Sequence, residues 1–167
     1  PVYIHAWDRA KLENLQIVQN EVKEEVATFT AVFEIEALQK QKATLLVETD
    51  SVQLGSASIQ LKEGTHKYSV DFQIKNPKLW WTNGLGEPHL YNITGKLKIK
   101  EMEVGENTRI GIRTLELVRE KDEEGTSFYF KLNGHPVFMK GANYIPNDVF
   151  LPRVTKDNYR KVMETAR

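Results

Sequence analysis

Three polar side chains follow one apolar strand in the C-terminal part of the chain. The strand is predicted for residues 137–141, and Asn143, Tyr144 and Asp148 come after it on a loop that contains Pro146. Barrel enzymes place their catalytic and binding residues at the C-terminal ends of strands, and amide, phenol and carboxylate groups occupy such a place here. Asp148 could accept hydrogen bonds from sugar hydroxyls, and Tyr144 offers an apolar ring face with a polar tip. The same spacing also fits a polar loop that does no more than cap the next helix.

A tight hairpin is predicted to lead into this strand. Asn133 and Gly134 lie between one apolar segment at residues 128–132 and another at residues 137–139. A two-residue hairpin turn of type I′ needs positive φ at both central positions, and asparagine and glycine tolerate that conformation. The pattern therefore predicts two antiparallel strands joined at residues 133 and 134.

An amphipathic helix is predicted after the polar loop. Thr155 is a good N-cap, and Asp157 places a carboxylate in the first turn, where the helix dipole favours it. A single apolar stripe follows at positions i, i+3, i+4 and i+7: Tyr159, Val162, Met163 and Ala166. Strand, loop and helix form one unit of a β/α barrel, and one unit cannot close a barrel. We therefore expect exposed apolar surface, open to self-association or to the rest of a barrel, at five positions: Val137, Phe138, Tyr159, Val162 and Met163.

The larger N-terminal part of the chain has the pattern of short antiparallel strands. Between residues 12 and 117 apolar and polar residues alternate with a period of two, which is typical of strands with one buried face. The clearest run has these residues on one face: Ala27, Phe29, Ala31, Phe33 and Ile35. The last predicted strand of the series covers residues 108–118. Turns are predicted at Gly55, Gly64, Asn76-Pro77, Asn83-Gly84 and Gly105. About seven strands without helical periodicity favour an immunoglobulin-like sandwich over a barrel.

We therefore predict a mainly β chain in two parts. Residues 1–118 form an immunoglobulin-like antiparallel β-sandwich. Residues 119–167 form a hairpin, a strand and a helix, which together make one unit of a β/α architecture. The charge-rich segment 120–125 marks the change, and we interpret it as a solvated turn; a metal-binding or acidic docking patch is the alternative.

The composition narrows the classes of partner. The 167 residues contain 23 basic and 23 acidic side chains, so the formal net charge is zero and nucleic acid is not an expected partner. No apolar run is long enough to cross a bilayer. The chain has no cysteine, which excludes disulfides and thiol nucleophiles and removes one guide to the compartment. The first residues have no signal-peptide pattern, and we interpret Pro1 as the cut end of a longer parent protein. If that parent is exported, we expect it to be secreted, periplasmic or lysosomal.

Other catalytic constellations are absent from the sequence. The four histidines, His5, His66, His89 and His135, are scattered singly, so we expect no metal site, and no phosphate-binding loop or nucleophile elbow indicates a cofactor or an acyl transfer. Glycoside hydrolysis needs two carboxyl groups, about 5–5.5 Å apart when configuration is retained. After the hairpin only Asp148 precedes the predicted helix, which carries Asp157 and Glu164 on the outside of any barrel. We therefore expect no catalytic residue in this chain and no hydrolysis by it alone.

Trp80 and Trp81 lie in the most unusual loop, residues 76–88. Paired indoles could stack on sugar rings, with Asn83 bonding to hydroxyls. They could equally pack the end of the sandwich or join it to the next domain, with each indole N–H satisfied. We favour the packing interpretation.

Three segments of the chain carry a family resemblance: residues 79–91, beginning Leu-Trp-Trp-Thr-Asn-Gly, residues 111–114, Gly-Ile-Arg-Thr, and residues 130–146, which contain Asn-Gly-His-Pro and Gly-Ala-Asn-Tyr-Ile-Pro. These segments resemble glycoside hydrolase family 2, and its β-mannosidase branch in particular. Asn147-Asp148 and the segment Leu-Pro-Arg-Val-Thr at residues 151–155 continue the resemblance to the β-mannosidases. Such enzymes carry an immunoglobulin-like sandwich before a (β/α)8 catalytic barrel. The resemblance therefore implies that residues 119–167 are the opening hairpin, first strand and first helix of that catalytic barrel, truncated after its first unit.

The resemblance implies a parent that removes terminal β-linked mannose from the non-reducing end with retention of configuration. Its two catalytic glutamates would lie on later barrel strands, and Asn143, Tyr144 and Asp148 match the first-strand motif that reaches the sugar pocket. A β-mannoside glycan and the chain's own downstream barrel are the implied partners. A β-galactosidase- or β-glucuronidase-like parent is one alternative, and a freestanding carbohydrate- or protein-binding sandwich is another.

Overall fold

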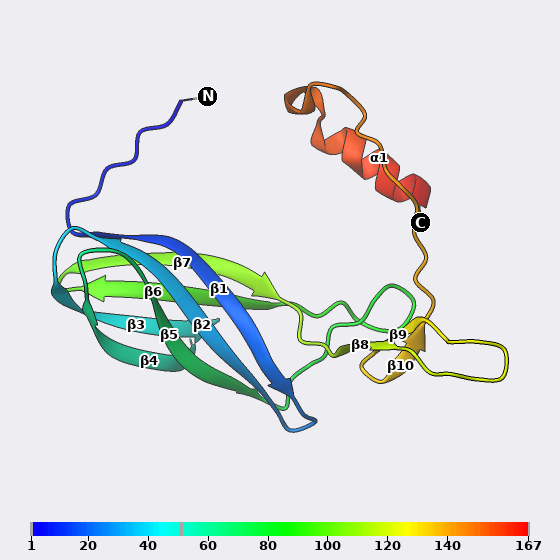
Figure 1. Cartoon of the computed structure of the whole chain (residues 1–167). Coiled ribbons are helices and arrows are strands. Elements are labelled where there is room, and N and C mark those ends of the chain that lie inside the picture. The colour runs from blue at the N-terminus through cyan, green and yellow to red at the C-terminus, as the bar shows by residue number, and fades with distance from the viewer. Residues whose placement is uncertain (1, 51, 167) are drawn as a thin grey trace. The chain divides into compact units, whose positions relative to one another are not determined.

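Seven antiparallel strands form a two-layered sandwich in the computed structural model, which describes residues 2–50 and 52–166 (Figure 1). The strands are β1 Ala10–Val22, β2 Val26–Ala37, β3 Gln41–Thr49, β4 Val52–Leu61, β5 Gly64–Lys75, β6 Tyr91–Ile99 and β7 Met102–Ile110. One sheet has the order β1-β2-β5 and the other β4-β3-β6-β7. The predicted mainly β sandwich is confirmed, and the described residues form no closed barrel.

The core of the sandwich is built by the alternation seen in the sequence. Along β2 every second residue is buried, and these inward side chains are at most 2% exposed: Ala27, Phe29, Ala31, Phe33, Ile35 and Ala37. From the facing sheet, Leu45 of β3 and Ile93 and Leu97 of β6 are fully buried. The ring of Phe29 stacks on that of Phe72 of β5 with centroids 5.1 Å apart. Burial of these side chains is the main force that holds the two sheets together.

Two of the predicted turn glycines lie inside strands instead. Gly55 belongs to β4 and Gly105 to β7. A Cβ added at Gly55 would come within 2.9 Å of the carbonyl oxygen of Asp71 on β5. Glycine is therefore needed at residue 55 for the close approach of two strands, not for a turn. Gly64 does begin β5 with a positive φ of 87°.

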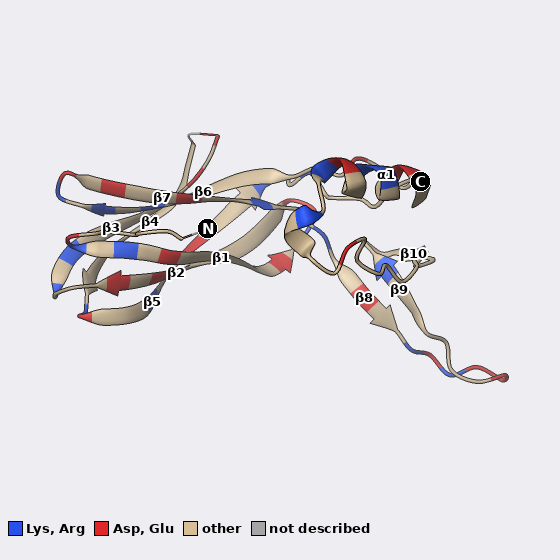
Figure 2. Cartoon of the chain, turned by 90° about the horizontal axis from the view of Figure 1, so that it is seen from above, with Lys and Arg blue, Asp and Glu red and all other residues tan. Residues whose placement is uncertain are grey.

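Basic and acidic residues both occur along the four-stranded sheet, where Figure 2 colours them blue and red, and some of them form ion pairs. Lys96 lies 2.7 Å from a carboxylate oxygen of Glu48, and Lys98 lies 2.8 Å from one of Glu103. The hydrogen bond to Glu48 raises the pKa of Lys96, and the hydrogen bond from Lys98 lowers the pKa of Glu103. The side chains of both ion pairs remain in contact with solvent, so the two pairs add little to stability.

A second, smaller sheet follows the sandwich and corrects the predicted strand 108–118. β7 ends at Ile110, and a separate strand, β8 (Leu115–Val118), pairs with β9 (Tyr129–Leu132), which pairs with β10 (His135–Val137). The break follows from the packing of Gly111, described below. The predicted hairpin is confirmed, since Asn133 and Gly134 have φ values of 50° and 80°.

The prediction of a strand over residues 137–141 is wrong beyond Val137. Phe138 is 84% and Met139 52% exposed, and the described residues supply no neighbouring strand for this stretch. Backbone amides without a partner strand cannot form a ladder, so apolar residue types alone do not make a strand.

The charge-rich segment 120–125 is a turn, as expected: Lys121 forms a β-bridge to Thr126, and the Asp122 carboxylate accepts hydrogen bonds from two backbone amides.

The chain divides into two units, Pro1–Val137 and Phe138–Arg167. The second unit holds a short 3-10 helix, η1 (Leu151–Arg153), and α1 (Lys156–Ala166). Thr155 caps α1 as predicted: the Asn158 amide donates to its hydroxyl over 3.3 Å, while the Thr155 amide donates to the Asn158 side chain over 2.8 Å. No helix among the described residues is long and apolar enough to span a membrane.

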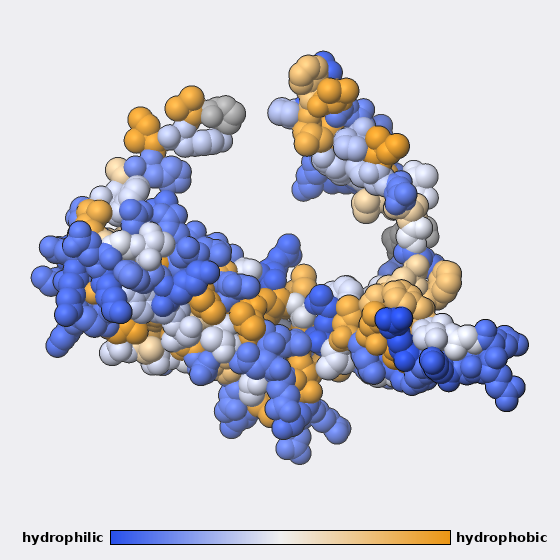
Figure 3. Space-filling model, in the orientation of Figure 1, coloured by the Kyte–Doolittle hydropathy of each residue, from blue (hydrophilic) through white to orange (hydrophobic). Residues whose placement is uncertain are grey.

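Apolar side chains lie exposed on the second unit, and Figure 3 shows them in orange on its surface. Phe138, Tyr159 and Met163 are exposed as predicted, whereas Val137 and Val162 are half-buried. The assignment of residues 119–167 to the start of a barrel stays a prediction.

Candidate functional site

The Trp80–Trp81 loop joins β5 to β6 and contacts the residues that separate β7 from β8. The Trp80 amide donates to the carbonyl of Ile112 over 2.8 Å. A Cβ added at Gly111 would meet the Trp80 side chain at 2.8 Å, so the indole lies directly on the glycine backbone. The Arg113 guanidinium lies over the same ring, 5.3 Å from its centroid. This packing keeps residues 111–114 out of a strand.

The hairpin turn is fastened to the same loop. The Asn133 side chain donates to the Trp80 carbonyl over 3.0 Å and accepts from the Thr114 amide over 2.9 Å. His135 meets the Trp81 ring edge-on, with centroids 5.3 Å apart. Both indoles therefore pack against backbone and hairpin, which supports the packing interpretation of the double tryptophan over sugar stacking.

A third contact fastens the first strand to this junction. The Gln19 side chain of β1 donates to the Arg113 carbonyl over 2.8 Å and accepts from the Arg113 amide over 3.3 Å. Together with Asn133, it ties the sandwich to the β8-β9-β10 sheet. The junction has the character of a structural brace inside the first unit.

We expect Gly111→Ala to lower the free energy of unfolding by about 1–3 kcal/mol, because the new methyl group would force the Trp80 indole out of place. Gly125→Ala is the matched control: nothing lies within 4 Å of an added Cβ there. Urea unfolding followed by tryptophan fluorescence measures both variants. Equal midpoints for the two would contradict the close packing at Gly111.

The three predicted sugar-binding residues lie together in the second unit, on the loop before η1. Asn143 is exposed, and Tyr144 is 46% exposed. The Tyr144 ring lies 6.5 Å from that of Tyr159 on α1, centroid to centroid. Asn143 and Tyr144 thus present an amide and a ring face to solvent, where a ligand could reach them. Their role in sugar binding stays a prediction.

Asp148 accepts two hydrogen bonds from residues that follow it in the chain. Its Oδ1 accepts from the Phe150 amide over 2.7 Å and from the Arg153 guanidinium over 2.8 Å. These two hydrogen bonds, that from Arg153 first, lower the pKa of the Asp148 carboxyl. Arg153 also lies over the Phe150 ring, 4.8 Å from its centroid.

Phe150 and Arg153 are not among the residues predicted from the sequence to bind sugar. An aspartate two residues before an amide that it can accept from is a signal for a local turn, and it would have indicated Phe150. Nothing in the spacing indicated that the arginine of η1 returns to the same oxygen. Asp157 is in the first turn of α1, as predicted, and lies 3.8 Å from Arg160.

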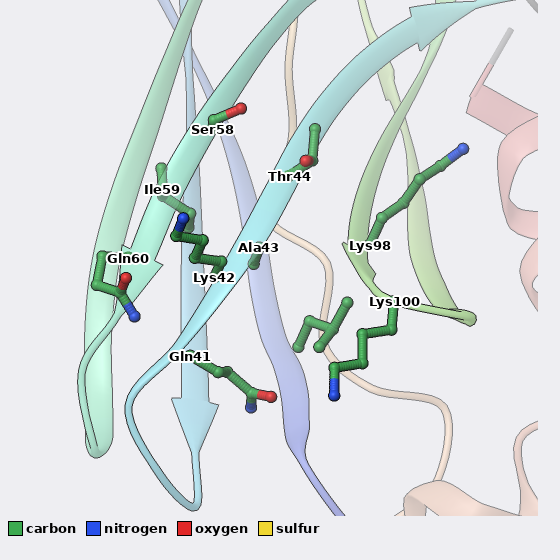
Figure 4. A pocket seen from close by; sticks show the side chains of 10 residues that line it. Gln41, Lys42, Ala43, Thr44, Ser58, Ile59, Gln60, Lys98 and Lys100 are labelled. Carbon is green, nitrogen blue, oxygen red and sulfur yellow. The ribbon is translucent and has the colours of Figure 1, made fainter.

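A separate surface hollow lies over strands β3, β4 and β6 of the sandwich (Figure 4). Its polar lining consists of Gln41, Lys42, Thr44, Ser58, Gln60, Lys98 and Lys100. This lining has no carboxylate or histidine to move a proton, and Lys98 is already paired with Glu103. Over the described residues no group of three or more histidine, aspartate or glutamate side chains could hold a metal ion. The hollow therefore lacks the pair of carboxyl groups that glycoside hydrolysis requires.

Comparison with known proteins places the chain in a family. Residues 10–113 match the family model of glycosyl hydrolases family 2. The chain is 37% identical to β-mannosidase B of Aspergillus flavus over 140 residues, which is 83% of this chain and 16% of that protein.

Solved structures give the same result. A β-D-mannosidase from Dictyoglomus thermophilum matches 97% of this chain with a TM-score of 0.85 and 33% identity, covering 20% of its own chain. The Parabacteroides merdae β-glucuronidase matches 93% of this chain and 19% of its own chain, with a TM-score of 0.69. At 19% identity this match shows only that the two share a fold. The chain thus spans a fifth or less of these relatives. It belongs to glycosyl hydrolases family 2.

Proposed function

We propose that this chain is the central sandwich and the barrel entrance of a longer exo-acting β-mannosidase. The parent removes terminal β-D-mannose residues from the non-reducing end and retains configuration. Its two catalytic glutamates lie outside these 167 residues. The observation that carries the proposal is the match to the Dictyoglomus thermophilum β-D-mannosidase, which extends over 97% of the chain, beyond the sandwich and into the loop with the candidate sugar-binding residues.

Within that parent, the described residues divide their roles. The sandwich supplies a rigid support, and the brace at Trp80, Gly111 and Asn133 orients the hairpin from which the polar loop departs. Asn143, Tyr144 and Asp148 form one wall of the sugar pocket. An amide, a ring face and a carboxylate are the groups that commonly position a sugar by hydrogen bonds and apolar contact.

The chain alone is expected to bind no sugar measurably, because one wall of a pocket buries too little of a ligand. Calorimetric titration with mannose and short β-mannosides should show no saturable heat. Saturable binding in the micromolar range, about −8 kcal/mol, would instead favour a freestanding carbohydrate-binding sandwich.

The longer protein is expected to hydrolyse 4-nitrophenyl β-mannoside in preference to the matching β-galactoside and β-glucuronide. The three kcat/KM values, measured side by side on the same preparation, decide the sugar. A higher kcat/KM on either of the other two substrates would overturn the assignment to mannose.

A further inference from the structure

The Asp148 carboxylate has one oxygen committed to the loop and one oxygen free. Oδ1 accepts both hydrogen bonds, from the Phe150 amide at 2.7 Å and from Arg153 at 2.8 Å. The described residues supply no hydrogen-bond donor to Oδ2. A carboxylate held in this way points its second oxygen in a fixed direction.

Arg153 is itself held in place from two sides. Its guanidinium lies 4.8 Å from the centroid of the Phe150 ring while one of its nitrogens donates to Asp148. Phe150 therefore contributes its amide to the carboxylate and its ring to the arginine. The three residues form a closed set, which we call the Arg153 clasp: Asp148, Phe150 and Arg153.

Stability alone is a weak reason for such an arrangement. The Arg153 side chain is 65% exposed and that of Asp148 28% exposed. Exposed ion pairs contribute little to folding, since both charges are well solvated before they meet. The clasp has a larger effect on the direction of one oxygen and on its charge than on the stability of the unit.

We propose that Arg153 is a positioning residue for sugar binding: it fixes the orientation of the Asp148 carboxylate, so that Oδ2 accepts a hydrogen bond from a hydroxyl of the terminal sugar. This inference rests on the proposed function. Hydrogen bonds from hydroxyls to an ionised carboxylate are about twice as strong as neutral ones. A protonated or rotated carboxyl group would forfeit that advantage.

The acid side of the pH range is where the clasp matters. Arg153 is the one charged group that the described structure gives Asp148 as a neighbour, and it lowers the pKa of that carboxyl. Because the pKa of Asp148 is lower in the folded loop than in the unfolded chain, the clasp is fully formed at any pH above the pKa of Asp148 in the unfolded chain. The clasp is lost as the pH falls through the pKa of Asp148 in the folded loop.

The first test uses the 167-residue chain and does not depend on activity. Nuclear magnetic resonance titration of the Asp148 carboxyl carbon is carried out for the unaltered chain, Arg153→Gln, Arg153→Lys and Arg160→Gln. Arg160, on α1, is a matched control because it lies near Asp157 instead. We expect the Asp148 pKa to rise in Arg153→Gln, to rise less in Arg153→Lys and to stay unchanged in Arg160→Gln. An unmoved titration in Arg153→Gln overturns the clasp.

The second test places the same variants in the longer protein. With a β-mannoside as substrate, Arg153→Gln should raise KM about tenfold, a loss typical of a weakened charged hydrogen bond, and move the acid limb of kcat/KM to higher pH. Arg153→Lys should restore part of both. If Arg153→Gln matches Arg160→Gln in an active protein, the positioning role is refuted. An unaltered protein that cleaves no β-mannoside refutes the proposed function itself, which separates the two failures.

Discussion

Phe33→Ala is expected to lower the free energy of unfolding of the sandwich by about 3–5 kcal/mol. The Phe33 side chain is fully buried in β2. A Cβ built on Gly95 of β6 would lie only 2.9 Å from its ring, so the ring fills the space between the sheets at a point where the facing strand has no side chain. Removing it leaves a cavity that a glycine opposite cannot fill.

Urea unfolding monitored by tryptophan fluorescence measures this loss, because all three tryptophans, Trp7, Trp80 and Trp81, belong to the first unit. Phe128→Ala is the matched control, since Phe128 is 68% exposed and its truncation should cost under about 0.5 kcal/mol. Phe33→Leu keeps most of the volume and gives a measurable fold if the alanine variant does not fold. A cost for Phe33→Ala no greater than for Phe128→Ala would disprove the central place of this ring.

Asp148→Asn should reduce kcat/KM for a β-mannoside by about 10–100-fold in the longer protein, which corresponds to the 1.5–3 kcal/mol of a charged hydrogen bond. Asparagine keeps an oxygen that can accept from the Phe150 amide, so the turn survives while the charge is lost. The loss should fall mainly on sugar binding and should therefore appear in KM.

Asp157→Asn makes the equivalent change on α1, where the carboxylate is exposed and lies 3.8 Å from Arg160. Its kcat/KM should stay within about twofold of the unaltered protein, because an exposed pair of this kind contributes little. Circular dichroism confirms that both variants fold. An Asp148→Asn enzyme as active as Asp157→Asn would show that Asp148 only caps its loop, the alternative that the spacing also allowed.

Local pattern was sufficient for the elements whose own residues decide their conformation. The alternation in β2 predicted its buried face residue by residue, because the side chains of a strand point alternately to opposite faces. Asn133-Gly134 predicted the hairpin, because few other residue pairs tolerate positive φ at both positions. Thr155 predicted the start of α1 for a similar reason: its hydroxyl meets an amide of the first turn without help from elsewhere.

The misassigned elements are those whose conformation depends on distant residues. Residues 138–141 have strand-forming side chains but no neighbouring strand among the described residues, and the break between β7 and β8 depends on an indole some 30 positions earlier in the chain, at Trp80. Gly55 lies in β4 and not at the predicted turn, because β5 approaches it closely and the residues next to it in the sequence do not indicate that approach.

Residue pattern was enough to predict the β-sandwich, its buried faces, the hairpin and the three candidates for sugar binding, Asn143, Tyr144 and Asp148. The folded structure was needed to find that the tryptophans brace the hairpin and that Arg153 and Phe150 share one oxygen of Asp148. Periodicity and turn preference act within a few residues, whereas close packing and charge pairing depend on which segments the folded chain brings together.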